Sequence, residues 1–132
     1  MGETLQLAKG RSSMGEPNSY DEIKEHVEHG KGVATVYAAS LRDAEGAGRL
    51  TSSINVKISR SLEQRGLGHV PFAASALPTS QWDLVRVFDK TSPLGQVLLA
   101  AHTVGEDSDE RLRETVDGQA AVLLDQVRTL LT

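Results

Sequence analysis

Between positions 49 and 65 the chain gathers side chains that bind phosphates and base edges. Arginine and lysine pair with phosphate oxygens, arginine also binds guanine, and asparagine binds adenine. Two serines at the start of a helix can hold a phosphate together with the free backbone amides there. The candidate DNA contacts are Arg49, Ser52, Ser53, Asn55, Lys57, Ser59, Arg60 and Arg65. The alternative is a solvated helix face on which Glu63 offsets the positive charge.

One helix must position most of these side chains. Thr51 is a good N-cap residue, and apolar residues follow it at a spacing of four. Gly66 is suited to the end of the helix. The pattern predicts a helix over residues 51–65 with a basic, amide-bearing front and an apolar back formed by Ile54, Ile58 and Leu62.

Few residues support other chemistry. His26 and His29 lie one turn apart beside Glu22 and Glu25, but a structural zinc site needs four ligands, so we expect surface histidines and no metal site. The chain has no P-loop, HExxH or GxSxG motif. We therefore expect no catalytic residue and no cofactor, in a protein that is not an enzyme.

Length and composition fit one globular domain with modest extensions. The chain has 132 residues, 39% of them apolar, and no cysteine, which excludes disulfides and thiolate metal sites. The first twenty residues lack a signal-peptide core, and no apolar run approaches the length of a membrane span. We expect a cytoplasmic protein that has no membrane partner.

The net charge of −4 is unevenly distributed along the chain. Residues 33–104 carry seven Lys/Arg and five Asp/Glu, whereas residues 105–132 carry three and seven. An acidic total argues against indiscriminate coating of nucleic acid, which needs a broad basic surface. It permits a local basic patch on the central segment.

The segments before the basic helix contain further structural signals. Residues 1–18 are rich in Gly, Ser and Pro without a period, which predicts a mobile N-terminal arm. A helix is expected over residues 20–29. A second helix is expected to follow Thr35 as its cap and to end at Gly46 or Gly48, close enough to the basic helix to form a helix-turn-helix corner.

The segments after the basic helix predict extended structure and then a helix. Residues 83–89 alternate like a strand, and with the short extended piece at 69–71 they would form a two-stranded wing. Trp82 is expected to fold back onto the core; as an exposed side chain it would instead anchor a partner protein. For residues 93–102 a helix is favoured over a third strand.

The last segment, residues 109–131, is expected to be a long helix. Its apolar residues recur at heptad spacing over two heptads. The stripe would either dock on the chain's own domain or join two copies, so the candidate dimerisation residues are Leu112, Val116, Leu123, Val127 and Leu130.

The order of these elements resembles the winged-helix modules of bacterial regulatory proteins. The resemblance lies in the stretch LRDAEGAGRLTSSINVKISRSLEQRGLGHVPF and in the later segment WDLVRVF. There a glycine corner followed by arginine leads into a helix that ends in Gly-Leu before a proline-containing wing. The resemblance covers about 70 of 132 residues, and the matching residues are Gly46, Gly48, Arg49, Ile54, Ile58, Leu62, Gly66, Leu67, Pro71, Asp83 and Val85. It implies DNA binding, with the third helix in the major groove and the wing on neighbouring backbone or minor groove.

Together these observations predict a mostly α, α+β fold: a winged helix-turn-helix with a two-stranded wing and a C-terminal helical extension. The domains would be a flexible arm at 1–18, a winged-helix domain at 19–90 and a helical extension at 91–132. The expected function is a DNA-binding regulator of double-stranded DNA that acts as a homodimer. The alternative is a non-enzymatic adaptor that binds another protein through the winged-helix face or the Leu-rich C-terminal helix.

Overall fold

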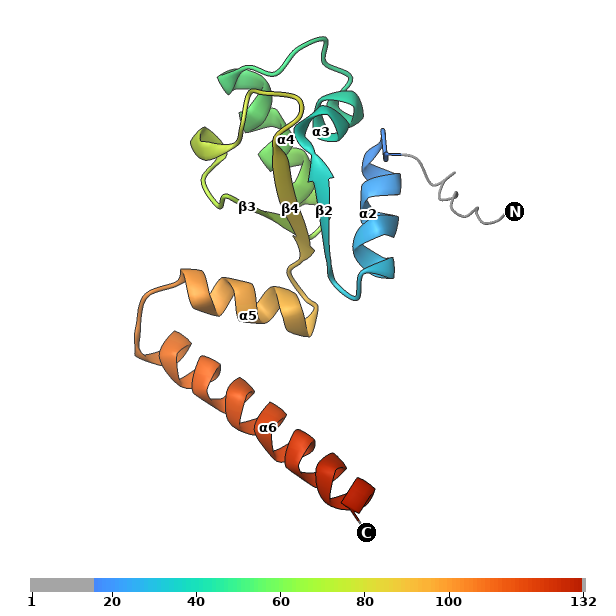
Figure 1. The fold of residues 1–132 in the computed structure, drawn as a ribbon. Coiled ribbons are helices and arrows are strands. Elements are labelled where there is room, and N and C mark those ends of the chain that lie inside the picture. The colour runs from blue at the N-terminus through green and yellow to red at the C-terminus, as the bar shows by residue number, and fades with distance from the viewer. Residues whose placement is uncertain (1–15, 132) are drawn as a thin grey trace, which may run out of the picture.

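The computed structural model describes residues 16–131, except for the side chains of Ala120, Ala121, Leu123, Leu124, Leu130 and Leu131. The fold is mixed α+β and mostly helical (Figure 1). In chain order its elements are α2 (Tyr20–His29), β2 (Val33–Tyr37), α3 (Ala38–Glu45), α4 (Ser52–Gln64), β3 (Leu67–Val70), the short 3-10 turn η1 (Ala74–Ala76), β4 (Leu84–Asp89), α5 (Pro93–His102) and α6 (Glu106–Leu131).

The three strands form one antiparallel sheet with β4 in the middle, in the order β2-β4-β3. Val36 pairs with Val85 and His69 pairs with Val87, so these residues fix the register on the two sides of β4. Helices α2, α3 and α4 pack against one face of the sheet, and α5 contacts β4. Figure 1 shows β2 and β4 in front of α3 and α4, with α6 extending away from this body.

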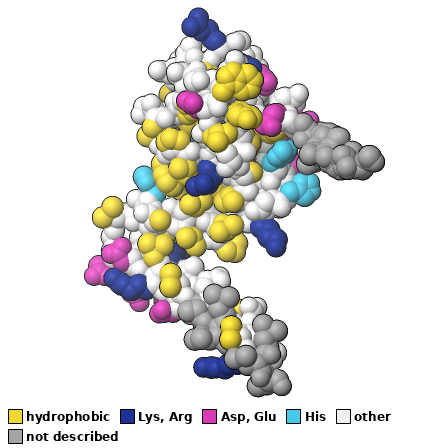
Figure 2. Space-filling view, in the orientation of Figure 1, with side chains coloured by type: hydrophobic (Ala, Val, Ile, Leu, Met, Phe, Trp, Pro, Cys, Tyr) yellow, Lys and Arg dark blue, Asp and Glu magenta, His cyan; other side chains and the backbone are white. Residues whose placement is uncertain are grey.

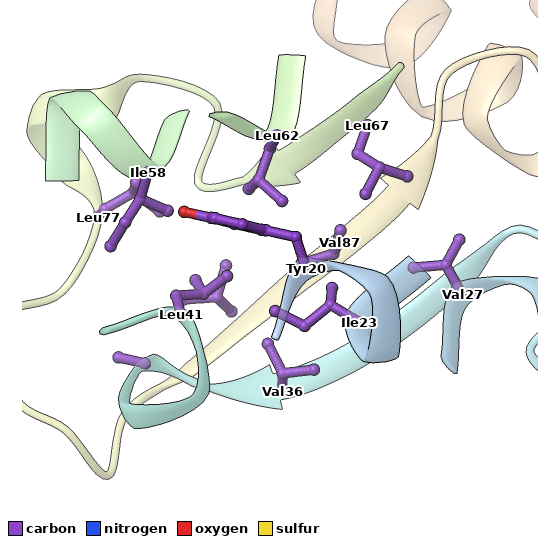
Figure 3. Close-up of a cluster of buried hydrophobic side chains, with 12 residues drawn as sticks. Tyr20, Ile23, Val27, Val36, Leu41, Ile58, Leu62, Leu67, Leu77 and Val87 are labelled. Carbon is purple, nitrogen blue, oxygen red and sulfur yellow. The ribbon is translucent and has the colours of Figure 1, made fainter. Parts of the chain in front are cut away.

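The core lies between the sheet and the three helices. Figure 3 shows Tyr20 of α2 in its centre, surrounded by side chains of α3, α4 and the sheet. The Tyr20 hydroxyl donates a hydrogen bond of 2.6 Å to Oε1 of Glu45, and burial, assisted by this carboxylate, raises the pKa of the phenol. The buried apolar side chains of the core are Tyr20, Ile23, Val27, Val36, Ala38, Leu41, Ile58, Leu62, Leu67, Leu77, Val85 and Val87.

The caps at the starts of three helices satisfy backbone donors that have no partner within the helix. The hydroxyl oxygens of Ser19, Thr51 and Ser92 accept hydrogen bonds from the N–H groups three residues downstream. The favoured helix at residues 93–102 is present, with Pro93 in its first turn, where its missing N–H costs nothing.

The second helix begins later than the sequence predicts, and the predicted two-stranded wing belongs to a larger sheet. Thr35 does not cap a helix; it lies inside strand β2, and α3 begins at Ala38. Residues 33–37 are β-branched or aromatic except for Ala34, and all five pair with β4, which satisfies the backbone groups that face it. The β3–β4 hairpin is therefore part of a three-stranded sheet.

The last residues of the predicted N-terminal arm belong to the folded part. Pro17 is buried, and the Asn18 backbone N–H donates a hydrogen bond of 2.9 Å to Oε1 of Glu22. The rest of the arm, residues 1–15, lies outside the described residues.

The C-terminal extension is a helical hairpin, and α6 begins three residues before the predicted start. The main packing partner of α6 is α5. Nη1 of Arg111 on α6 donates a hydrogen bond of 3.1 Å to Oε1 of Gln96 on α5. Over the described residues, no helix combines the length and the apolar character needed to cross a membrane.

Candidate nucleic-acid interface

Helix α4 presents a polar face because its apolar stripe is fixed in the core. Ile58 and Leu62 are fully buried, and Ile54 packs at the edge of the core. The opposite face carries the exposed residues Ser52, Ser53, Val56, Lys57, Arg60, Glu63 and Gln64. The apolar stripe predicted from the sequence is thus the side of α4 that faces the core.

Five of the eight candidate DNA contacts lie on this exposed side. Ser52 and Ser53 occupy the first turn of α4, and Lys57 and Arg60 follow along the same face. Arg49 is exposed in the corner that joins α3 to α4. This corner turns sharply at Gly46, whose φ of 73° is readily adopted by glycine. We call these five residues the α4 face.

Asn55 does not belong to the α4 face. Its side chain is only 3% exposed, and its amide nitrogen donates hydrogen bonds to the carbonyl oxygens of Leu77 (3.1 Å) and Pro78 (3.2 Å). The predicted contact with adenine is therefore wrong. The amide ties α4 to the loop that follows β3, and it satisfies two carbonyl groups there.

Ser59 is also turned away from solvent, toward a buried histidine. Nδ1 of His69 lies 2.6 Å from the carbonyl oxygen of Pro71, which can only accept, so Nδ1 carries the proton. Nε2 of the neutral ring then accepts from the Ser59 hydroxyl at 2.7 Å. Burial lowers the pKa of His69, which favours this neutral form. Ser59 is thus a structural partner of His69.

Arg65 is exposed like Arg60, but its guanidinium lies over the ring of Tyr20. Its guanidinium carbon lies 4.4 Å from the centre of the Tyr20 ring, a cation–π contact, and its Nη1 donates to the carbonyl oxygen of Ser61 at 2.9 Å. The guanidinium thereby covers the end of α4 and does not extend the α4 face.

A polar hollow of about 230 Å³ lies beside the start of the α4 face. Its lining includes Arg49, from the corner between α3 and α4, and Arg42 of α3, which was not among the predicted DNA contacts. Arg42 is held by Gln81, with 2.6 Å between Nη1 and Oε1, and by an ion pair with Asp43 at 3.1 Å. The link from Arg42 to Gln81 joins positions 39 residues apart, so no sequence pattern signals it.

The one carboxylate on the exposed side of α4, Glu63, pairs with a lysine outside the helix. Oε2 of Glu63 lies 4.0 Å from Nζ of Lys90, an exposed and weak ion pair. The charges of Lys57 and Arg60 have no ion-pair partner among the described residues.

The loop between β3 and β4 packs on the body and leaves an aromatic side chain exposed. Leu77 is buried in the core beneath α4. Trp82, expected in the core, is 66% exposed and packs edge-to-face with Tyr37, with ring centres 5.7 Å apart. Leu84, which pairs with Tyr37 across the sheet, is 60% exposed. The open side of the sheet therefore presents an apolar patch of Tyr37, Trp82 and Leu84.

The candidate dimerisation residues fall on α6, away from the sheet. Val116 and Val127 are 64% and 49% exposed, and Leu112 is half-buried. The side chains of Leu123 and Leu130 lie outside the described residues.

His26 and His29 both lie on α2, near its end. Within residues 16–131, the described side chains include no group of three or more histidines and carboxylates placed to hold a metal ion.

The chain matches no protein-family model, no curated protein and no solved structure.

Proposed function

We propose that this protein is a non-enzymatic DNA-binding regulator whose α4 face contacts double-stranded DNA. One observation carries the proposal: Arg49, Lys57 and Arg60 lie on one exposed side of α4, and that helix is fixed on the core by its other side. A rigid helix with basic and hydroxyl side chains on its free face suits insertion into the major groove.

We further infer a winged-helix fold for residues 19–90. The supporting feature is the order helix α2, strand β2, helices α3 and α4, then the β3–β4 hairpin, with β4 between the other two strands. In such a fold α4 is the recognition helix and the loop from 71 to 83 is the wing.

Each residue of the α4 face has a role that its position suggests. Arg49 and the first-turn serines would bind backbone phosphates and fix the register of the helix on the duplex. Arg60 would reach a guanine edge, and the exposed Val56 beside it would meet a thymine methyl group. Lys57 would contribute a further phosphate contact.

The number of basic residues on the α4 face determines how strongly DNA binding should depend on salt concentration. The loop from 71 to 83 has no Lys or Arg, so on random-sequence DNA about three basic side chains, Arg49, Lys57 and Arg60, are available to contact phosphates. The logarithm of the binding constant should then fall with the logarithm of salt concentration with a slope of about −3.

Fluorescence anisotropy of labelled random-sequence duplex DNA tests this proposal. The labelled duplex is titrated with protein at low and at physiological salt. We expect binding that weakens with salt along this shallow slope. Absence of binding at low salt would overturn the proposal and leave the α4 face as a solvated surface.

We place two copies in the functional unit, joined through the C-terminal helix α6, in the cytoplasm. The exposed Val116 and Val127 support this part of the proposal, because a single helix cannot bury its own apolar stripe. Light scattering across micromolar concentrations tests it independently of DNA.

The apolar patch of Tyr37, Trp82 and Leu84 favours a second candidate, a protein adaptor. Exposed Trp and Tyr side chains are enriched among the anchors of protein interfaces. An adaptor would bind its partner without DNA, and substitution of Trp82 would abolish that binding. The DNA-binding account predicts that Trp82→Ala leaves duplex affinity unchanged, so this one variant separates the two candidates.

A further inference from the structure

The α5–α6 hairpin has arms of very different length. Its shorter arm, α5, has 10 residues and spans about 15 Å, whereas α6 has 26 residues and spans about 39 Å. The short arm therefore accompanies only the first part of α6. The remainder extends past the start of α5, away from the sheet (Figure 1).

A groove of about 360 Å³ runs along the hairpin. On α5 it is lined by Gln96 and by the apolar side chains of Pro93, Leu94 and Val97, with Leu94 45% exposed. Its wall on α6 is formed by Arg111, Thr115 and Gln119. The groove is thus open at the level of the first half of α6.

Two exposed valines lie along α6 beside this groove. Val116 and Val127 are separated by eleven residues, which is about three helical turns, so they lie on the same side of the helix. In the sequence Ala120 and Leu123 fall between them at heptad positions. A second helix laid along α6 would cover both valines and the heptad positions between them.

We propose that the α6 helix of a second copy fills both surfaces and that the two α6 helices run antiparallel. This inference rests on the proposed homodimer and specifies its geometry. In an antiparallel pair the far half of each α6 lies beside the α5–α6 groove of the other copy, so the groove and the two valines are covered together. A parallel pair would bring the two far halves against each other and leave both grooves open.

The charge distribution along α6 favours the same orientation. Residues 106–117 contain six Asp/Glu and two Arg, whereas residues 118–131 contain one Asp and one Arg. Figure 2 shows acidic side chains gathered near the start of α6. Parallel packing would set the two acidic segments within about one Debye length of each other, whereas antiparallel packing places them at opposite ends of the pair.

Heptad geometry then gives the register of the pair. In an antiparallel pair an a position of one helix packs against a d position of the other. Val127 and Val116 occupy such positions, so Val116 of one copy faces Val127 of its partner. The partner's Leu123 then faces Ala120.

Because the chain has no cysteine, single-cysteine variants test the orientation directly. Val116→Cys and Val127→Cys are made separately, mixed under reducing conditions to exchange subunits, and then oxidised. We expect a disulfide-linked dimer in the mixture and none with either variant alone. Both valines are exposed in the single chain, so cysteine at either position leaves its own packing intact.

Glu114→Cys and Asp125→Cys, on the opposite face of α6, form the matched control pair and should not cross-link. Disulfides within each valine variant alone would indicate a parallel pair and overturn the proposal. Light scattering that finds only monomers, or a dimer whose mixture does not cross-link, would overturn it as well.

The same samples separate this proposal from the proposed function. Duplex anisotropy depends on the α4 face, and cross-linking depends on α6. A cross-linked antiparallel dimer that does not bind DNA would refute only the proposed DNA binding. A monomer that binds DNA would refute only the proposed pairing of the α6 helices.

Discussion

The side-chain nitrogen of Asn55 lies 3.1 Å from the carbonyl oxygen of Leu77, and this contact joins α4 to the loop that leads into β4. The same nitrogen lies 3.2 Å from the carbonyl oxygen of Pro78. One buried amide thus fixes the position of the helix that carries the α4 face. Its effect on DNA binding would be indirect, through the position of that helix.

Replacing Asn55 with alanine should lower the free energy of unfolding by about 1–3 kcal/mol, because two loop carbonyls lose their donor. Urea unfolding measures the change. Gln64→Ala, at an exposed position of the same helix, is the control and should stay within about 0.5 kcal/mol of the parent protein. Equal stability of the two variants would show that the buried amide contributes nothing.

Replacing Lys57 or Arg60 with alanine should weaken binding to duplex DNA, and each change should reduce the salt slope by about one. If Arg60 binds a base edge, its loss should also cost about 1–3 kcal/mol on the specific site. Anisotropy titrations at several salt concentrations measure both quantities.

Arg65→Ala is the matched control for these variants, because its guanidinium lies over Tyr20. It should lower the stability by up to about 1 kcal/mol and leave the salt slope unchanged. A slope that falls as much for Arg65→Ala as for Arg60→Ala would mean that binding does not depend on the α4 face.

Acidification from pH 7.5 to 5.5 should destabilise the protein through His69. Burial holds the pKa of this histidine below its usual value, so the unfolded chain binds a proton more readily than the folded one. Above the pKa that His69 has in the unfolded chain, the neutral histidine contributes its full stabilisation. This contribution decreases as the pH falls through that value toward the lower pKa of the folded state. Urea unfolding at the two pH values measures the loss, in a range above the titration of most carboxylates.

Two substitutions separate His69 from the other histidines. His69→Gln should remove most of this pH dependence, and His29→Gln, at an exposed position, should preserve it. An unchanged pH dependence in His69→Gln would assign the effect to another group.

Replacing Gly68 with alanine should destabilise the sheet by about 1–3 kcal/mol. A methyl group at this position would come within 2.4 Å of the Phe88 ring, which lies over the glycine and is fully buried. Gly48→Ala is the control, because nothing lies within 4 Å of its added methyl group. Thermal unfolding compares the two, and similar melting temperatures would contradict the close packing of Phe88 on β3.

The parts of the fold that the sequence predicted depend on local signals. The caps at Ser19, Thr51 and Ser92 act within three residues, and the apolar stripe of α4 acts within one helix, so both can be read from the chain. Strand β2 was missed because Thr35 suits a helix cap as well as a strand. Its pairing with Arg86, 51 positions away, decides between the two.

The site was predicted in part for the same reason. Helical spacing separates Lys57 and Arg60 from the buried stripe, but it leaves Asn55 and Ser59 at the edge of that stripe. Their partners, Leu77 and His69, come from the following loop and strand. The exposure of Trp82 likewise depends on how the loop packs, since Leu77 and not Trp82 closes the core.

The central claim, that the α4 face binds DNA, is tested most directly by following backbone amide signals in an NMR titration with duplex DNA. We predict the largest shifts at Arg49, Ser52, Ser53, Lys57 and Arg60, with little change at Tyr37 and Leu84 on the open side of the sheet. Shifts confined to the sheet side, or no shifts at all, would contradict the claim.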